Sequence, residues 1–290
     1  MLLCNLDGVI TPEATISVLD RGFLYGDSVY EVIRTYQGIP FALKEHLARL
    51  RASAAYLYMT VPWSDEYITQ EVQRTLAAAP RGEYYIRIVV TRGRDRRIGL
   101  LPEPTTQTRL LIVLMAIAPE PTLSEQGIRL TIAKRQRMST AALDPAAKTG
   151  NYLNNILALL EAQQAGFDDA LLLNAHGQIT EATTSNLWIV RDGVVETPPT
   201  TVGILPGITR GILLKLLADL GIPHREVILA PQDLARASEG FLSSSVRLLM
   251  PIRQVDEVLF PVCPGPVTQK LWQELLAVME KAALAQIQSF

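Results

Sequence analysis

The stretch DPAAKTGNY, residues 144–152, places Lys148 among small neighbours just before an apolar segment that predicts a helix over residues 151–164. A lysine held in a cavity at this point would lose solvation, which favours its neutral and nucleophilic form. Spacing alone favours a solvated loop lysine, because lysine side chains are seldom buried. The significance of Lys148 therefore depends on groups elsewhere in the chain.

Two further stretches offer partners for such a lysine. Glu181 follows a predicted strand in ITEATTSN, residues 179–186, where its carboxylate could face a heterocyclic nitrogen or solvent. GILPGITR, residues 203–210, runs directly into a predicted helix over residues 208–220. Free N–H groups at a helix start, together with the Thr209 hydroxyl, can form an anion site, although an ordinary helix N-terminus has the same pattern.

Two more groups could contact the same anion. Ser243–Ser245 supply three hydroxyls or form a polar turn, and Arg49 lies on a predicted helix over residues 43–57, where it could bind a phosphate or remain solvated. Together these residues fit one ligand, a phosphorylated ring that carries an aldehyde and a basic nitrogen. Pyridoxal phosphate (PLP) is such a ligand.

Composition excludes several classes of protein. The chain has 290 residues, 48% of them hydrophobic and 19% charged, which is a globular balance with room for one large or two ordinary domains. The formal net charge of -2 argues against a nucleic-acid partner. Cys4 and Cys263 stand far apart and outside any metal-spaced cluster, so we expect neither a disulfide framework nor a metal site. Without a signal peptide or an apolar run of about 18 residues, we expect a cytoplasmic protein with no membrane partner.

Hydrophobic periodicity predicts strands and helices that do not alternate strictly, which indicates an α+β protein. The predicted strands cover residues 2–5, 9–10, 29–36, 39–41, 84–91, 110–118, 128–133, 170–174, 178–180, 186–191 and 239–243. The predicted helices cover residues 43–57, 64–79, 151–164, 208–220 and 268–287, and a loop over residues 17–22 leads into residues 23–27. Two prolines in residues 118–122 predict an N-terminal domain over 1–118, a linker over 119–127 and a C-terminal domain over 128–290.

Five ordered motifs resemble those of the class IV, or fold-type IV, PLP-dependent aminotransferases. The motifs are DRGFLYGDSVYEVIR (20–34), EHLARL (45–50), KTGNYLNN (148–155), the stretch around Glu181, and GILPGITR (203–210), with Ser243–Ser245 near the end. The resemblance covers nearly the whole chain. It implies a small N-terminal α/β domain, a larger C-terminal α/β barrel-like domain and a homodimer.

The resemblance also implies roles for individual residues. Lys148 would bind the cofactor covalently and move the proton, Glu181 would keep the pyridine nitrogen protonated, and Tyr152 would bind the ring hydroxyl. The implied phosphate cup consists of Arg49, Ile208, Thr209 and Ser245. The three histidines, His46, His176 and His224, are isolated in the sequence, and none is expected to act as a catalytic base or ligand.

Substrate specificity is indicated by a second set of residues. Tyr85 and Arg87 resemble the Tyr-x-Arg motif of branched-chain amino-acid aminotransferases, where the arginine helps to receive the distal carboxylate of glutamate. Tyr25 and Arg34 fit the same group. The resemblance thus implies transfer of an amino group between an L-branched-chain amino acid and 2-oxoglutarate.

Two alternatives stay open within the same fold. Tyr30-Glu31-Val32 is more similar to D-amino-acid aminotransferases, which place an arginine and a histidine in the loop over residues 91–99. Arg97 could be that arginine and trap a substrate carboxylate, but Gly99 stands in place of the histidine. A D-amino-acid or (R)-amine transaminase is therefore an alternative. An aminodeoxychorismate lyase is disfavoured, because Val32 stands where that enzyme has a threonine.

Overall fold

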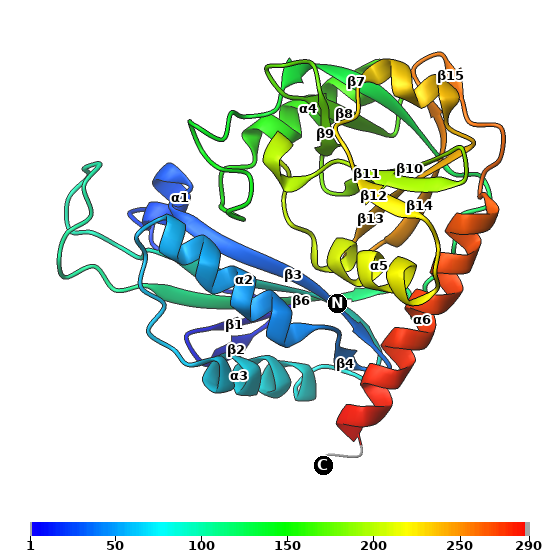
Figure 1. The fold of residues 1–290 in the computed structure, drawn as a ribbon. Coiled ribbons are helices and arrows are strands. Elements are labelled where there is room, and N and C mark those ends of the chain that lie inside the picture. Colours follow the sequence, from blue (N-terminus) through cyan, green and yellow to red (C-terminus); the bar gives the residue numbers. More distant parts are fainter. Residues whose placement is uncertain (1, 288–290) are drawn as a thin grey trace. The chain divides into compact units, whose positions relative to one another are not determined.

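The computed structural model describes residues 2–287, which form two compact units (Figure 1). The first unit contains the chain up to Pro119, the segment Ala147–Asn151 and the chain from Glu280 onward. The second contains Glu120–Ala146 and Tyr152–Met279. The predicted domains, 1–118 and 128–290 with a linker between them, stay a prediction. The short segment around Lys148 belongs to the first unit although it lies far along the chain.

A six-stranded antiparallel sheet with the order β2-β1-β6-β5-β3-β4 forms the centre of the first unit. Its strands are β1 (Leu2–Leu6), β2 (Val9–Thr11), β3 (Ser28–Tyr36), β4 (Ile39–Pro40), β5 (Glu83–Thr91) and β6 (Arg109–Ile117). Val29 pairs with Val90 and Ile33 with Ile86, so apolar side chains of neighbouring strands meet on one face. Successive residues of β3 point to opposite faces, so Tyr30 and Arg34 share the other one.

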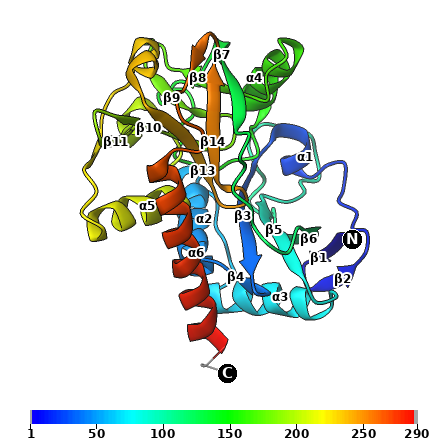
Figure 2. The ribbon, with the colours of Figure 1, turned by 90° about the vertical axis from the view of Figure 1, so that its right-hand side faces the viewer.

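Two helices cover the apolar face of this sheet, α2 (Leu43–Tyr56) and α3 (Asp65–Ala77), as Figure 2 shows. The buried apolar side chains of α2 recur every three or four residues, which is the spacing of one helix face. They are Leu43, Leu47, Leu50 and Ala54, and they form one core with Ile68 and Val72 of α3 and with the strands. Ser64 caps α3 by accepting a hydrogen bond from Tyr67 N at 3.2 Å.

The loop predicted before β3 is wrong in part, because residues Arg21–Tyr25 form a short helix, α1. The Asp20 side chain caps it by accepting from Gly22 N at 2.8 Å, and Gly26 ends it with a left-handed φ of 69°. Five residues are too few to show a helical period in the sequence.

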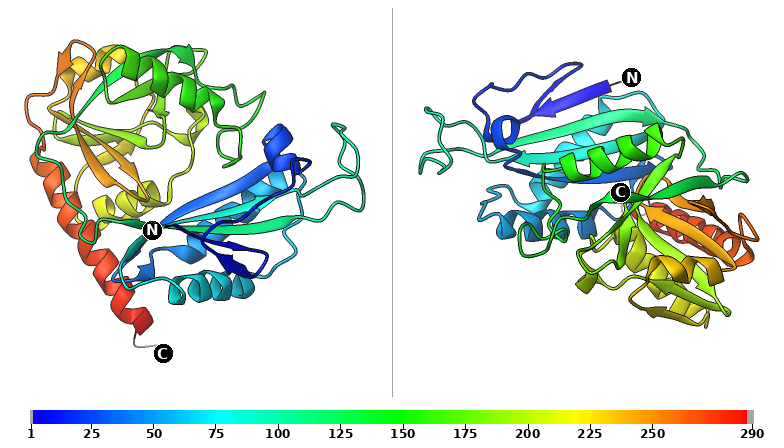
Figure 3. Two further views of the ribbon diagram at one scale, coloured as in Figure 1. Left: turned by 180° about the vertical axis from the view of Figure 1, so that it is seen from behind. Right: turned by 90° about the horizontal axis from the view of Figure 1, so that it is seen from above.

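The second unit has a nine-stranded mixed sheet with the order β12-β11-β10-β13-β14-β7-β8-β9, and β15 pairs with β14. Its strands are β7 (Ile128–Gln136), β8 (Asp169–Leu173), β9 (Ile179–Ala182), β10 (Asn186–Arg191), β11 (Val194–Thr197), β12 (His224–Glu226), β13 (Glu239–Ser244), β14 (Leu248–Val255) and β15 (Val258–Leu259). The sheet curls until β9 and β10 approach each other, where Ala182 N donates to Ser185 O at 2.8 Å (Figure 3). This curled sheet confirms the predicted α+β class with a barrel-like C-terminal part.

Helices α4 (Leu153–Gln164) and α5 (Ile208–Asp219) pack against this sheet, and α6 (Pro266–Ile287) follows at the end of the chain. Two 3-10 turns, Thr200–Val202 and Pro231–Arg236, lie between these elements. Inside the sheet the rings of Trp188 and Phe241 stack with their centroids 5.7 Å apart. No helix within residues 2–287 is long and apolar enough to cross a membrane. The predicted cytoplasmic location stays a prediction.

Candidate active site

The backbone around Lys148 is held along the edge of β3. Lys148 N donates to Ser53 Oγ at 3.0 Å, and Lys148 O accepts from Tyr30 N at 3.0 Å. Gly150 N donates to Ser28 O at 2.8 Å, and a Cβ at Gly150 would lie only 2.3 Å from Ser28 Oγ. The lysine therefore sits on a segment that is hydrogen-bonded to the sheet and not on a solvated loop.

Aromatic and cationic side chains gather beside this lysine on the face of the sheet away from α2. Lys148 Nζ lies 4.7 Å from the centroid of the Tyr30 ring, and Arg87 Cζ lies 3.8 Å from the same centroid. Tyr85 OH accepts from Arg87 Nη1 at 3.4 Å, and Tyr85 pairs across the strands with Arg34. Four of the predicted substrate residues thus share one patch of β3 and β5 with Lys148.

The opposite face of β3 carries a buried ionic cluster between the strand and α2. Glu31 is fully buried, and its carboxylate oxygens accept from Arg49 Nε and Nη2 at 2.7 Å each. His46 Nδ1 lies 2.7 Å from Glu31 Oε2. Burial alone would raise the pKa of Glu31, but the hydrogen bonds from Arg49 and His46 outweigh it and lower the pKa to about 2.

His46 is isolated in the sequence, but the fold brings it against Glu31. Desolvation lowers the pKa of His46 from its ordinary value, although its hydrogen bond with Glu31 opposes the shift. Arg49, predicted to bind phosphate, is held by Glu31 in a two-pronged ion pair, which fixes the plane of its guanidinium group.

In the second unit, Glu181 is buried near the end of β9 and accepts hydrogen bonds from side chains and backbone around it. Its Oε1 accepts from Arg137 Nη2 at 2.5 Å, and its Oε2 accepts from Asn186 Nδ2 and Leu205 N, each at 3.1 Å. Arg137 Nη1 in turn donates to Asn155 Oδ1 at 2.9 Å. Arg137, Asn155 and Asn186 are not among the predicted site residues. Asn155 and Asn186 lie inside the quoted stretches KTGNYLNN and ITEATTSN, whereas Arg137 lies in neither.

The start of α5 lies next to Glu181 in this network. Gly207 is the N-cap of α5, and no side-chain hydrogen bond caps the first N–H groups of the helix there. A Cβ at Gly207 would lie 2.1 Å from Asn186 Oδ1. Ile208 and the buried Thr209 are the first residues of α5. The two remaining predicted cofactor residues flank other elements: Ser245 follows β13, and Tyr152 directly precedes α4.

Comparison with known proteins identifies the family of this chain. A family model described as amino-transferase class IV matches residues 28–255. The chain belongs to the class IV aminotransferases. A putative branched-chain-amino-acid aminotransferase of Methanocaldococcus jannaschii is 38% identical over 270 residues, which cover 93% of each chain.

Two further comparisons cover most of this aminotransferase. A D-alanine aminotransferase of Bacillus licheniformis is 31% identical over 265 residues, covering 89% of this chain and 90% of the relative. The crystal structure of the branched-chain amino acid aminotransferase of Escherichia coli matches with a TM-score of 0.90 and 30% identity, covering 96% of this chain and 94% of the other.

Class IV aminotransferases are PLP-dependent transaminases, and the residues of this aminotransferase fit that cofactor. The uncapped start of α5 can bind a phosphate group, because its N–H groups and the helix dipole favour an anion. Glu181, which pairs with Arg137 and accepts from Asn186 and Leu205 N, has a carboxylate of the kind that could face a protonated ring nitrogen. Lys148 carries a primary amine, the group that a PLP aldehyde requires.

Two predicted substrate residues of the aminotransferase lie outside the cluster around Tyr30. Arg97 has a side chain that is 91% exposed, with Glu103 3.9 Å away. Tyr25 lies at the end of α1, where Arg21 Cζ is 5.0 Å from the centroid of its ring. Within residues 2–287, the patch on β3 and β5 therefore contains Tyr30, Arg34, Tyr85 and Arg87 but neither of these two.

Proposed function

We propose that this class IV aminotransferase moves the amino group of an L-branched-chain amino acid to 2-oxoglutarate. The observation that carries the proposal is the joint position of Lys148, Tyr30 and Arg87, in which both cations contact one tyrosine ring. A cationic Arg87 so near to the lysine suits a dicarboxylic acid, since it can receive the distal carboxylate. The branched-chain aminotransferases among the relatives support the same substrates.

Each residue has a defined task in this proposal. Bound PLP supplies an electron-withdrawing ring conjugated to the substrate Cα. Lys148 Nζ would take and hold the proton from the substrate Cα, and Glu181 would accept a hydrogen bond from the protonated ring nitrogen. Tyr152 donates to or accepts from the ring hydroxyl. Arg49, Ile208, Thr209 and Ser245 would hold the phosphate group.

A panel of single half-reactions tests this proposal. The cofactor-loaded protein is mixed with L-leucine, L-valine, L-glutamate, D-alanine or D-glutamate, and the loss of the visible absorbance of lysine-bound PLP is followed. We expect L-leucine, L-valine and L-glutamate to react fastest. Faster reaction of D-alanine or D-glutamate would overturn the substrate assignment. The Lys148→Ala variant should lack the band, and the exposed Lys44→Ala variant should keep it.

A second candidate function is transamination of a D-amino acid or an (R)-amine. The D-alanine aminotransferase relative supports it, as does the sequence Tyr30-Glu31-Val32. In this case Arg97 would bind the substrate carboxylate. The Arg97→Ala variant should then lose most activity with D-alanine, while the equally exposed Arg96→Ala variant should not. Equal activities of the two variants would count against this candidate.

We also propose that the enzyme is a homodimer. Helix α4 exposes large apolar side chains at the spacing of one helix face, namely Leu153, Ile156, Leu157 and Leu160. Such a stripe is costly in water and is typical of a surface between subunits. Sedimentation of Leu157→Arg should show dissociation, whereas Gln164→Arg on the same helix should sediment like the wild type. A wild-type protein that sediments as a monomer would contradict the proposal.

A further inference from the structure

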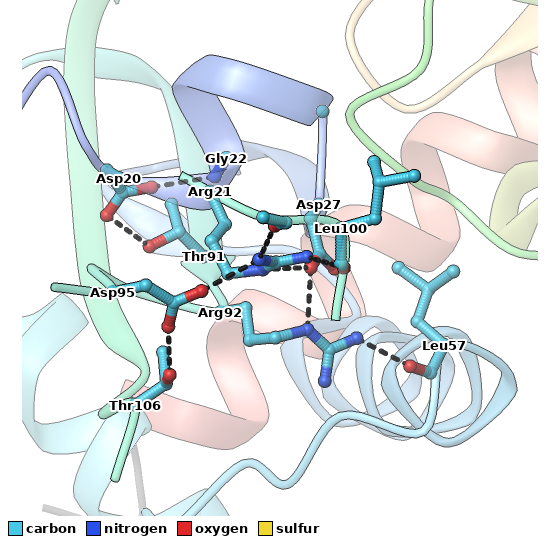
Figure 4. Close-up of polar contacts among 12 residues, drawn as sticks. Asp20, Arg21, Gly22, Asp27, Leu57, Thr91, Arg92, Asp95, Leu100 and Thr106 are labelled. Atoms are coloured by element: carbon cyan, nitrogen blue, oxygen red, sulfur yellow. Dashed lines mark hydrogen bonds and ion pairs between the residues drawn. The ribbon is translucent and has the colours of Figure 1, made fainter. Parts of the chain in front are cut away.

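Arg21, the first residue of α1, places a buried guanidinium group at a meeting point of several chain segments in the first unit (Figure 4). Its Nε donates to Asp27 Oδ2 at 3.0 Å, just beyond the C-terminus of α1. Its Nη1 donates to Asp95 Oδ2 at 2.7 Å and to Gly99 O at 2.8 Å, and its Nη2 donates to Leu100 O at 2.6 Å. One side chain therefore binds α1 to the chain between β5 and β6.

We call residues 92–108 the β5–β6 connection. Its two ends meet closely, because a Cβ at Gly93 would lie 1.7 Å from the Gln107 carbonyl oxygen. Arg21 N also donates to Gly93 O at 2.8 Å. Asp27 accepts a second charged donor, Arg92 Nε, at 2.7 Å. The base of the connection is thus fixed to α1 by charged hydrogen bonds, which are stronger than neutral ones.

The outer part of the same connection has little packing to hold it. The side chains of Ile98, Leu100 and Leu101 are 73%, 83% and 87% exposed. Arg97 is exposed beside them. Asp95 also accepts from Thr106 Oγ1 and from Glu103 N within the connection itself. With few buried apolar contacts there, the bonds from Arg21 to Asp95, Gly99 and Leu100 are the ones that hold residues 95–100 against α1.

We infer that Arg21 is a positioning residue that couples α1, and with it Tyr25, to the β5–β6 connection that carries Arg97. Tyr25 ends the helix that Arg21 begins, and the Arg21 guanidinium lies over its ring. The consequence for substrate binding rests on the proposed function, in which Tyr25 and Arg97 contact the substrate. Arg21 itself touches neither substrate nor cofactor in this role.

Limited digestion with trypsin tests the coupling directly, because Arg94, Arg96 and Arg97 are exposed cleavage sites in the connection. We expect Arg21→Met to be cut at these sites about tenfold faster than the wild type, since Asp27 and Asp95 lose their shared partner. Asp95→Asn, which keeps the side-chain shape and the Arg21–Asp27 pair, should give a smaller increase. Arg51→Gln removes a half-exposed ion pair with Asp65 in the same unit and should leave the rate unchanged.

Steady-state kinetics provide the second readout. Arg21→Met and Asp95→Asn should both bind PLP and show the wild-type absorbance. In both variants we expect KM for the amino acid and for the oxo acid to rise by up to about tenfold, while kcat stays within about twofold of the wild type. Unchanged digestion and KM in folded Arg21→Met, or a loss in kcat alone, would overturn the inference. If the wild type fails to react with branched-chain amino acids, the proposed function is wrong. The digestion would still test whether Arg21 couples α1 to the β5–β6 connection.

Discussion

Arg49 of α2 donates two parallel hydrogen bonds to Glu31 of β3, from Nε and from Nη2, each 2.7 Å long. Both side chains are buried, so the pair has little competition from water. A guanidinium group held at two points keeps one orientation. If Arg49 binds the cofactor phosphate as proposed, Glu31 determines the direction in which its charge faces.

The first prediction concerns this pair. Glu31→Gln removes the charge that orients Arg49, and we expect PLP to bind about tenfold more weakly, because a hydrogen bond to a charged group contributes about 1.5–3 kcal/mol. Titration of the apoprotein with PLP measures this. Glu45→Gln, an exposed position on the same helix, is the matched control. Comparable affinities in the two variants would show that Glu31 does not act through Arg49.

The second prediction concerns protonation of His46. Burial lowers the pKa of His46, so below about pH 6.5 the unfolded chain binds a proton at this residue more readily than the folded protein does. The contribution of His46 to the free energy of unfolding is therefore complete above about pH 6.5 and is lost as the pH falls. The chain has only three histidines, so selective isotope labelling gives three ring signals. The signal that disappears in His46→Gln should titrate with a midpoint below 6.5. A midpoint above 6.5 would contradict the shift.

The third prediction is that Glu31, like His46, contributes less to the stability of the fold as the pH falls. The pKa of Glu31 is about 2 in the folded protein against an ordinary value of 4.5 in the unfolded chain, so its contribution to stability is complete above about pH 4.5. It is lost as the pH falls towards 2. Denaturant unfolding between pH 6 and pH 3 should show a weaker decline for Glu31→Gln than for the wild type, while Glu45→Gln should follow the wild type. Parallel curves for all three proteins would refute the prediction.

The fourth prediction compares Gly207, the N-cap of α5, with Gly211 inside α5. Gly207→Ala brings a Cβ to 2.1 Å from Asn186 Oδ1, so Asn186 must move and Glu181 loses a donor. We expect a loss of about 1–3 kcal/mol in unfolding free energy and weaker PLP binding. Gly211 lies in the same helix with open space around it, so Gly211→Ala should stabilise by about 0.5–1 kcal/mol. Thermal unfolding of both variants measures these opposite changes in stability. An unchanged stability of Gly207→Ala would contradict the close contact between residue 207 and Asn186.

The fifth prediction concerns the carboxylate of Glu181. Glu181→Gln keeps a side chain of the same shape in the network but removes its negative charge. We therefore expect PLP to stay bound while kcat falls about 10²–10³-fold, the range typical of a lost preorganised electrostatic contact. Glu161→Gln on α4, whose carboxylate pairs with Arg135 at the surface, should keep near-normal turnover. Full activity in Glu181→Gln would remove this residue from the proposed mechanism.

Much of the fold could be predicted from sequence, because most elements have a clear period. The helices at Leu43–Tyr56 and Ile208–Asp219 begin at the predicted residues, and their ends differ by one residue from the prediction. β14 (Leu248–Val255) was missed, since Pro251 and Arg253 interrupt its apolar run, although Pro251 pairs with Phe241 inside the sheet. A strand whose apolar residues lack a regular spacing, such as β14, can be recognised only from its contacts in the folded protein.

The same limit applies to the site. Lys148 and Glu181 stand in recognisable motifs, whereas Glu31 and His46 meet only because β3 packs beneath α2. They lie 15 residues apart on different elements, so no local spacing reveals the contact. The contact of Arg137 with Glu181 could not be predicted from the sequence either, because a basic residue at the end of a strand is usually solvated.

Strand β3 has bonding partners on both of its edges near Ser28–Tyr30, with β5 on one side and the Lys148 segment on the other. An insertion or deletion of a single residue between Gly26 and Tyr30 would turn every following side chain of the strand to the opposite face and pull the lysine out of line with Tyr30. The turn at Gln37–Gly38 is exposed and lies at the far end of the strand, so added length there leaves those bonds intact. Loop grafting in this enzyme therefore belongs at the hairpin tip and not at the glycine that precedes β3.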